Sequence, residues 1–133
     1  MIRAFLLCAA ALPGAAAAQS LAPMADTVLT DTDRAALRLT VRNPGVRSMR
    51  LVLSAHEADW SALPGAEASR GVIDLAGGAE ASVLVTVPMD GGRHRDFRIC
   101  ATGVPEASDW GQKGGQIVRG QVCGRYAAWR HGR

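Results

Sequence analysis

Aromatic residues, lysine and long apolar runs are scarce in this sequence of 133 residues. Aromatic side chains make up 5% of it, and only one of its fifteen basic residues is lysine. Few rings are available to stack on bases, so a nucleic-acid partner is not expected. No run approaches the ~20 apolar residues of a membrane-spanning helix. We therefore expect the mature chain neither to bind nucleic acid nor to insert into a membrane.

Motifs for catalysis and metal binding are missing as well. Residues 56–60, HEADW, lack the second histidine of the zinc motif HExxH. Ser54 and His56 are close in sequence, but no G-x-S-x-G elbow is present. Met89 and His94 are possible copper ligands, but the arginines around them oppose a cation. The sequence therefore predicts a protein that is not an enzyme and that holds no metal or other cofactor.

The first 18 residues have the pattern of a secretory signal peptide. Arg3 precedes an apolar run from Ala4 to Leu12, and small residues follow at Ala16 to Ala18. Cleavage after Ala18 leaves residues 19–133, a length typical of one domain. We expect this domain to be a monomer in the periplasm or in the extracellular medium.

Two cysteines remain in the mature chain, Cys100 and Cys123. An even number of cysteines in an exported protein indicates a disulfide bond, and the two are not spaced as C-x-x-C. The bond would close a loop around 22 residues. On the chain-entropy model such a loop stabilises the fold by about 3 kcal/mol.

Apolar residues alternate with polar ones along most of the chain, which is the period of half-buried strands. Helical periodicity is absent from every long segment. Glycine and proline separate the alternating segments at short intervals. Six or seven short strands of this kind predict an immunoglobulin-like β-sandwich of two antiparallel sheets. Strands are expected at residues 36–42, 49–55, 71–75, 82–87, 97–102 and 116–126.

The cysteines also predict how the last two strands pair. If Cys100 lies opposite Cys123, Phe97 lies opposite Tyr126 on the other side of the sheet. This aromatic cross-strand pair supports the register and places the disulfide on the outer, polar face.

The same register places Arg98 opposite Arg125, and like charges in that position are destabilising. A bulge could shift the strands, or an anionic group could lie between the two guanidinium groups. Alternatively, the two long side chains could diverge into water. All three arrangements remain open at this stage.

Charge is divided unevenly along the chain. Residues 19–92 carry six basic and nine acidic groups, whereas residues 93–133 carry eight basic and three acidic groups. The net charges are therefore −3 and +5. The basic part is either a solvated face or a surface for an anionic partner, since a patch of one sign speeds encounter with its complement.

The three tryptophans lie outside the predicted strands. Trp110 belongs to the long loop Gly103–Gln116, and long loops in compact domains are often functional. Trp60 is expected to cover the core, and Trp129 lies near a terminus that is expected to fray. Tryptophan and arginine are both enriched at binding hot spots. The candidate partner-binding residues are Arg98, Arg119, Arg125 and Trp110.

Two segments of the chain resemble known modules. The segment LRLTVRNPGVRSMRLVLSAHEADW, followed by IDLAGGAEASVLVTVP, resembles bacterial immunoglobulin-like domains of the NPCBM-associated type. The similarity covers about residues 36–102 and includes a strand, an N-x-G turn, a strand leading to tryptophan, and L-x-x-G-x-x-x-x-V-x-V-x-V-P. The resemblance implies the sandwich fold and an accessory, non-catalytic role. It implies no particular functional residue.

A weaker resemblance is to the small periplasmic proteins of the curli-assembly inhibitor family. It includes size, export and the segment SRGVIDLAGGAEASV. The sequence thus predicts an exported binding or accessory domain that acts on an envelope protein or an anionic polysaccharide. The alternative is a periplasmic chaperone or an inhibitor of amyloid assembly.

Overall fold

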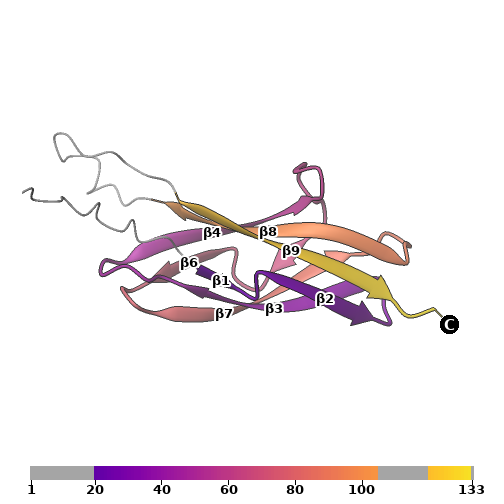
Figure 1. The fold of residues 1–133 in the computed structure, drawn as a ribbon, viewed down its shortest axis with the longest axis horizontal. Coiled ribbons are helices and arrows are strands. Elements are labelled where there is room, and N and C mark those ends of the chain that lie inside the picture. The colour runs from indigo at the N-terminus through magenta and orange to yellow at the C-terminus, as the bar shows by residue number, and fades with distance from the viewer. Residues whose placement is uncertain (1–19, 105–119, 133) are drawn as a thin grey trace, which may run out of the picture.

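A computed structural model describes residues 20–104 and 120–132 of the chain. Within these ranges two β-sheets pack face to face (Figure 1). The strands are β1 (Ser20–Ala22), β2 (Ala25–Thr30), β3 (Arg34–Arg42), β4 (Met49–Glu57), β5 (Glu67–Ala68), β6 (Val72–Leu75), β7 (Glu80–Pro88), β8 (His94–Val104) and β9 (Gln121–Arg130). The signal peptide expected at residues 1–18 lies outside the described residues.

The two sheets confirm the predicted immunoglobulin-like sandwich. One has the order β1-β3-β7-β5 and the other β2-β9-β8-β4-β6. Neighbouring strands are antiparallel except β2 and β9, which run in the same direction. The described residues contain no helix that is long and apolar enough to cross a bilayer.

The alternating pattern forms the core as the sequence predicted. In β3, Leu37, Leu39 and Val41 are buried, while the residues between them are more exposed. The strand pairs with β7, whose Val83 and Val85 are also buried. Burying each such side chain contributes roughly 1.5–3 kcal/mol. These contributions hold the four-stranded sheet against the five-stranded one.

The predicted pairing of the last long strands is confirmed. Cys100 lies opposite Cys123 and the two form a disulfide bond. Phe97 lies opposite Tyr126 with ring centroids 5.7 Å apart, and both rings are buried in the core. The alternation of the strand turns the disulfide to the outer side of the five-stranded sheet.

Strands β1 and β2 were not predicted. Only two apolar side chains of this segment, Leu21 and Val28, pack against the core. The chain also changes sheets here: β1 pairs with β3, and β2 pairs with β9 (Figure 1). Such a segment has weak periodicity, since neither half is a long half-buried strand. Its burial depends on partners far away in sequence.

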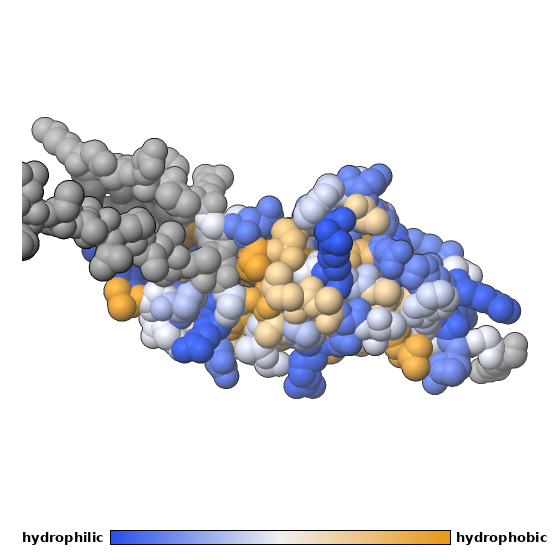
Figure 2. Space-filling view, viewed as in Figure 1, coloured by the Kyte–Doolittle hydropathy of each residue, from blue (hydrophilic) through white to orange (hydrophobic). Residues whose placement is uncertain are grey.

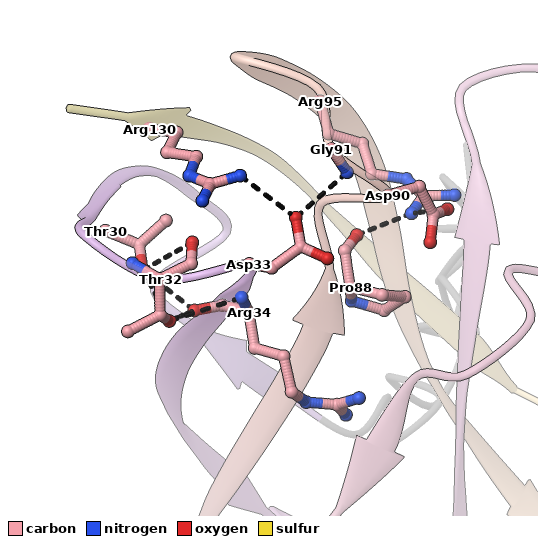
Figure 3. Close-up of polar contacts among 9 residues, drawn as sticks. All are labelled: Thr30, Thr32, Asp33, Arg34, Pro88, Asp90, Gly91, Arg95 and Arg130. Atoms are coloured by element: carbon pink, nitrogen blue, oxygen red, sulfur yellow. Dashed lines mark hydrogen bonds and ion pairs between the residues drawn. The ribbon is translucent and has the colours of Figure 1, made fainter. Parts of the chain in front are cut away.

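One end of the sandwich is held by charged side chains from strands and turns that are distant in sequence (Figure 3). Asp33, between β2 and β3, accepts hydrogen bonds from Arg130 Nη1 at 3.2 Å and from the backbone N–H of Gly91 at 2.9 Å. Arg95 of β8 donates to Asp90 Oδ2 at 2.8 Å and also contacts Glu57. We call the five charged residues of this cluster, Asp33, Glu57, Asp90, Arg95 and Arg130, the paired end.

Candidate functional site

The outer side chains of the five-stranded sheet form rows, because neighbouring strands lie in register. One row contains Ala25, Arg125, Arg98 and His56, from β2, β9, β8 and β4 respectively. The next contains Thr27, Ala127 and Asp96. Small side chains therefore lie beside two arginines.

A hollow of about 690 Å³ opens over these two rows. Its lining includes Ala25, Thr27, Ala58, Arg98, Arg125 and Ala127. Ala58 belongs to the turn after β4. Figure 2 shows a patch of apolar residues midway along the visible face, with hydrophilic side chains around it. The hollow thus combines small apolar side chains with two guanidinium groups.

Arg98 lies opposite Arg125 without a bulge, as the cysteine register predicted. Its guanidinium carbon is 4.3 Å from the centre of the Trp60 ring. Its Nε and Nη2 each donate a long hydrogen bond of 3.4 Å to the carbonyl oxygen of Ala58. Arg98 thus turns toward the turn after β4, where a cation–π contact supports it.

Arg125 contrasts with its neighbour. Among the described residues, its side chain makes no hydrogen bond or ion pair. Two acidic residues line the hollow, and each carboxylate has another contact. Asp96 pairs with His94 Nε2 at 3.2 Å, and Asp26, whose side chain turns to the inner side of the sheet, accepts the N–H of Thr27 at Oδ1 at 2.8 Å. The positive charge of Arg125 is therefore available to a bound group.

Trp60 does not cover the core, contrary to the sequence prediction. Its side chain is 53% exposed, and its backbone has a φ of 72°. The turn closes on itself, because Glu57 N–H donates to Ser61 O at 2.8 Å and Trp60 N–H to Glu57 O at 3.0 Å. Leu63 then enters the core, so Trp60 projects outward over Arg98.

Ser54 and His56 form a contact that the sequence raised as a possible catalytic pair. Ser54 Oγ lies 2.9 Å from His56 Nε2, and His56 Nδ1 lies 3.3 Å from the carbonyl oxygen of Trp60. In the Ser-His-Asp triad the third group is a carboxylate, which stabilises the charged imidazolium. Here a neutral carbonyl holds that place, so the contact orients His56 without supplying that stabilisation.

Tyr126 supports the hollow from within. Its hydroxyl donates a hydrogen bond of 2.7 Å to the carbonyl oxygen of Pro23, which ties β9 to the segment before β2. Burial, and secondarily the negative charge of Asp26, raises the pKa of Tyr126 to about 12. Both effects oppose formation of a buried phenolate.

An exposed apolar pair lies beyond the hollow, and the sequence reasoning missed it. Leu29 and Trp129 are neighbours on β2 and β9 and are 64% and 46% exposed. Trp129 is not frayed but belongs to β9, and the ring of His94 lies 4.1 Å from it. Extending the cysteine register along β9 would have placed Trp129 opposite His94. No feature of the sequence indicated that Leu29 lies beside Trp129 on a parallel strand.

The structure thus brings together two of the four predicted partner-binding residues, Arg98 and Arg125. The other two, Arg119 and Trp110, lie outside the described residues. Among the described residues, no three His, Cys, Asp or Glu side chains gather as they would around a metal ion.

No family model and no curated protein matches this chain. Solved structures do: the periplasmic chaperone SfaE has a TM-score of 0.66 and 11% identity, over 86% of this chain and 58% of that one. The E. coli chaperone DraB has a TM-score of 0.66 and 15% identity, over 86% and 55%. A PapD-like domain of human CEP192 has a TM-score of 0.63 and 14% identity, over 98% and 96%.

These similarities support the immunoglobulin-like sandwich fold, which this chain shares with the two chaperones and with the PapD-like domain of CEP192. The chain spans a little over half the length of the two chaperones. None of the three structures is a domain of the NPCBM-associated type, so that resemblance is not supported. The weaker resemblance, to the curli-assembly inhibitor family, agrees better with these structures, because two of them are chaperones.

Proposed function

We propose that this chain is an exported, non-catalytic binding protein of chaperone type that holds another polypeptide of the bacterial envelope. The contact surface is the outer face of β2, β9 and β8 around the hollow. The observation that carries the proposal is the guanidinium of Arg125, which has no partner among residues 20–104 and 120–132 and lies beside Arg98 over a hollow with small apolar side chains.

The fold supports this function by analogy. SfaE and DraB are chaperones, and the SafB chaperone, which is 18% identical to this chain, forms a complex with the SafA pilin. At such identities one fold can host unrelated functions, so the proposed function rests on the residues of the site. Export to the periplasm, expected from residues 1–18, would place this chain among unfolded envelope proteins.

The chemistry of the surface favours a polypeptide over a polysaccharide. An anionic polysaccharide would also attract Arg98 and Arg125. A polypeptide in addition accounts for the exposed apolar pair of Leu29 and Trp129, which would be shielded by apolar side chains of the partner. We also propose that Arg119 and Trp110, which lie outside the described residues, take part in binding as one more cation and an aromatic anchor.

Affinity capture from the native envelope fraction tests the proposal. The bait is the tagged protein, and the variant is the double reversal of Arg98 and Arg125 to Glu. Reversal of Arg38 and Arg42, two exposed arginines of β3 in the other sheet, makes the same change in net charge and is the matched control.

The proposal requires one dominant protein that wild type and control retain and the Arg98/Arg125 variant loses. Its aggregation should then be followed with the purified chain at several ratios. Delay at substoichiometric ratios indicates an inhibitor of fibril growth, whereas protection only near equal ratios indicates a holding chaperone. Equal capture by both double variants, or no protection at any ratio, would contradict the proposal.

A further inference from the structure

Among the described residues, β2 is the longest of the outermost strands of the two sheets. The outermost strands of the two sheets are β1, β5, β6 and β2, with three, two, four and six residues. One side of β2 pairs with β9, and no described strand pairs with the other. Such an edge presents backbone donors and acceptors that can bind an added strand.

The hydrogen bonds to β9 show which backbone groups of β2 are open. Arg125 N–H donates to Met24 O, and His131 N–H donates to Thr30 O, both at 2.9 Å. Since backbone groups alternate in direction along a strand, even-numbered residues of β2 face β9. The N–H and C=O groups of Ala25, Thr27 and Leu29 therefore face the open edge.

The side chains beside this edge differ along its length. Near its end, Leu29 lies next to Trp129, and both are exposed. Near its start, Ala25 lies next to Arg125, whose charge has no partner among the described residues. An added strand would thus lie beside an apolar pair at one end and a cation at the other.

We propose that the β2 edge binds an extended segment of the partner polypeptide by strand addition. The segment carries an apolar residue beside Leu29 and an acidic residue four positions further, beside Ala25 and Arg125. We take it as antiparallel to β2, the slightly more stable arrangement. This inference rests on the proposed function and specifies the partner's sequence class.

Asp26 adds a selective element on the inner side of the edge. Its carboxylate accepts the N–H of Thr27, one of the groups that an incoming strand must use. An added strand therefore displaces this carboxylate and leaves it near the strand. An acidic residue of the segment opposite Asp26 would be repelled, so the acidic residue belongs on the outer face.

A second copy of this chain fits the edge less well. In a two-fold antiparallel pair centred on Thr27, Leu29 of one copy lies opposite Ala25 of the other. The acidic residue of β2, Asp26, then alternates to the opposite side of the sheet from Arg125. Self-association would leave the guanidinium unmatched, whereas a segment with an outward acidic residue pairs with it.

Amide NMR of the labelled protein with synthetic peptides tests the inference. The probe is Thr-Phe-Val-Thr-Thr-Glu-Thr, in which the apolar and acidic residues share one face. We expect saturable shifts of the Thr27 and Leu29 amides. Methylating the peptide nitrogens that face β2 should abolish binding, because it removes the donors without changing the side chains.

Variants then separate side-chain contributions. Leu29→Lys should weaken peptide binding at least about tenfold, whereas Val72→Lys, at an exposed apolar position on the edge strand β6, should not. Arg125→Glu should weaken binding by a similar factor, and a peptide with Lys in place of Glu should restore it. The inference would be overturned if Leu29→Lys bound the peptide as tightly as wild type, or if the lysine peptide failed to restore binding to Arg125→Glu.

Two further outcomes would also overturn it. One is sedimentation of the protein as a dimer that Leu29→Lys dissociates, because the occupant would then be a second copy. The other is capture of a partner that depends on Arg98 and Arg125 but not on Leu29, which would leave the proposed function intact. Peptide binding without any captured partner would instead support the edge site and contradict the proposed function.

Discussion

The arginines of the five-stranded sheet lie in two contrasting settings. At the paired end, Arg95 is buried to 14% exposure and contacts both Glu57 and Asp90. Burial opposes its charge, but the two carboxylates more than compensate and raise the pKa of Arg95 above its ordinary value. Three residues further along β8, Arg98 contacts an indole ring and a carbonyl but no described carboxylate.

The difference follows from the alternation of the strand. Arg95 shares its side of β8 with the core residue Phe97, so its charge requires partners within the protein. Arg98 and Arg125 have the opposite parity and face outward. A strand rich in arginine can therefore contain some arginines that pair within the protein and others that are open to a partner. An arginine separated from a core residue by an even number of positions faces inward, and one separated by an odd number faces outward.

The largest expected effect concerns the hollow, which lacks the ion pairs of the paired end. The disulfide Cys100–Cys123 lies one row from Arg98 and Arg125 and ties β8 to β9. Reduction should lower the free energy of unfolding by about 3 kcal/mol, because the unfolded chain gains the freedom of an open loop. Urea unfolding of the oxidised and reduced protein measures this. Identical urea midpoints for the oxidised and reduced protein would mean that packing alone, without the disulfide, stabilises the strands around the hollow.

The second-largest expected effect on the free energy of unfolding concerns the paired end. Arg95→Ala should lower the free energy of unfolding by about 2 kcal/mol, since it leaves the half-buried Glu57 without its cation. Arg130→Ala is the matched comparison in the same cluster. Its contact with Asp33 is more exposed, so the loss should stay below about 1 kcal/mol. A reversed ranking in urea unfolding would contradict the burial argument.

A third effect concerns the buried hydroxyl beneath the hollow. Tyr126→Phe should lower the free energy of unfolding by about 1 kcal/mol at neutral pH, through loss of the bond to Pro23. The pKa of Tyr126 is raised to about 12 in the folded state, against about 10 unfolded. The unfolded chain therefore releases the proton first, and wild-type stability should fall as pH rises from about 10 to about 12.

Two measurements check this prediction. Tyr126 is the only tyrosine in the chain, so its titration can be followed directly by the absorbance of tyrosinate. Urea unfolding across the same pH range should show a shallower decline in Tyr126→Phe than in wild type. Parallel declines, or ionisation near the ordinary value, would show that the hydroxyl is not buried in solution.

The fold was largely predictable because its long strands bury one face each. The cysteine pair alone gave the register of β8 and β9, and so the opposition of Arg98 and Arg125. The direction of Arg98 was not predictable, because it depends on a turn in which Trp60 has positive φ. The apolar pair of Leu29 and Trp129 was missed because a parallel strand joins residues from opposite ends of the chain.

The smallest expected effect completes the comparison with Arg95. Arg125→Gln removes a charge that has no partner among the described residues, so the free energy of unfolding should change by less than about 0.5 kcal/mol. Binding of an acidic partner segment should nevertheless weaken, because glutamine cannot supply the charge-assisted contact of guanidinium with carboxylate. Urea unfolding and peptide titration on the same samples separate the two quantities. A loss of stability near that of Arg95→Ala would assign Arg125 a structural role and remove the basis for treating the hollow as a binding surface.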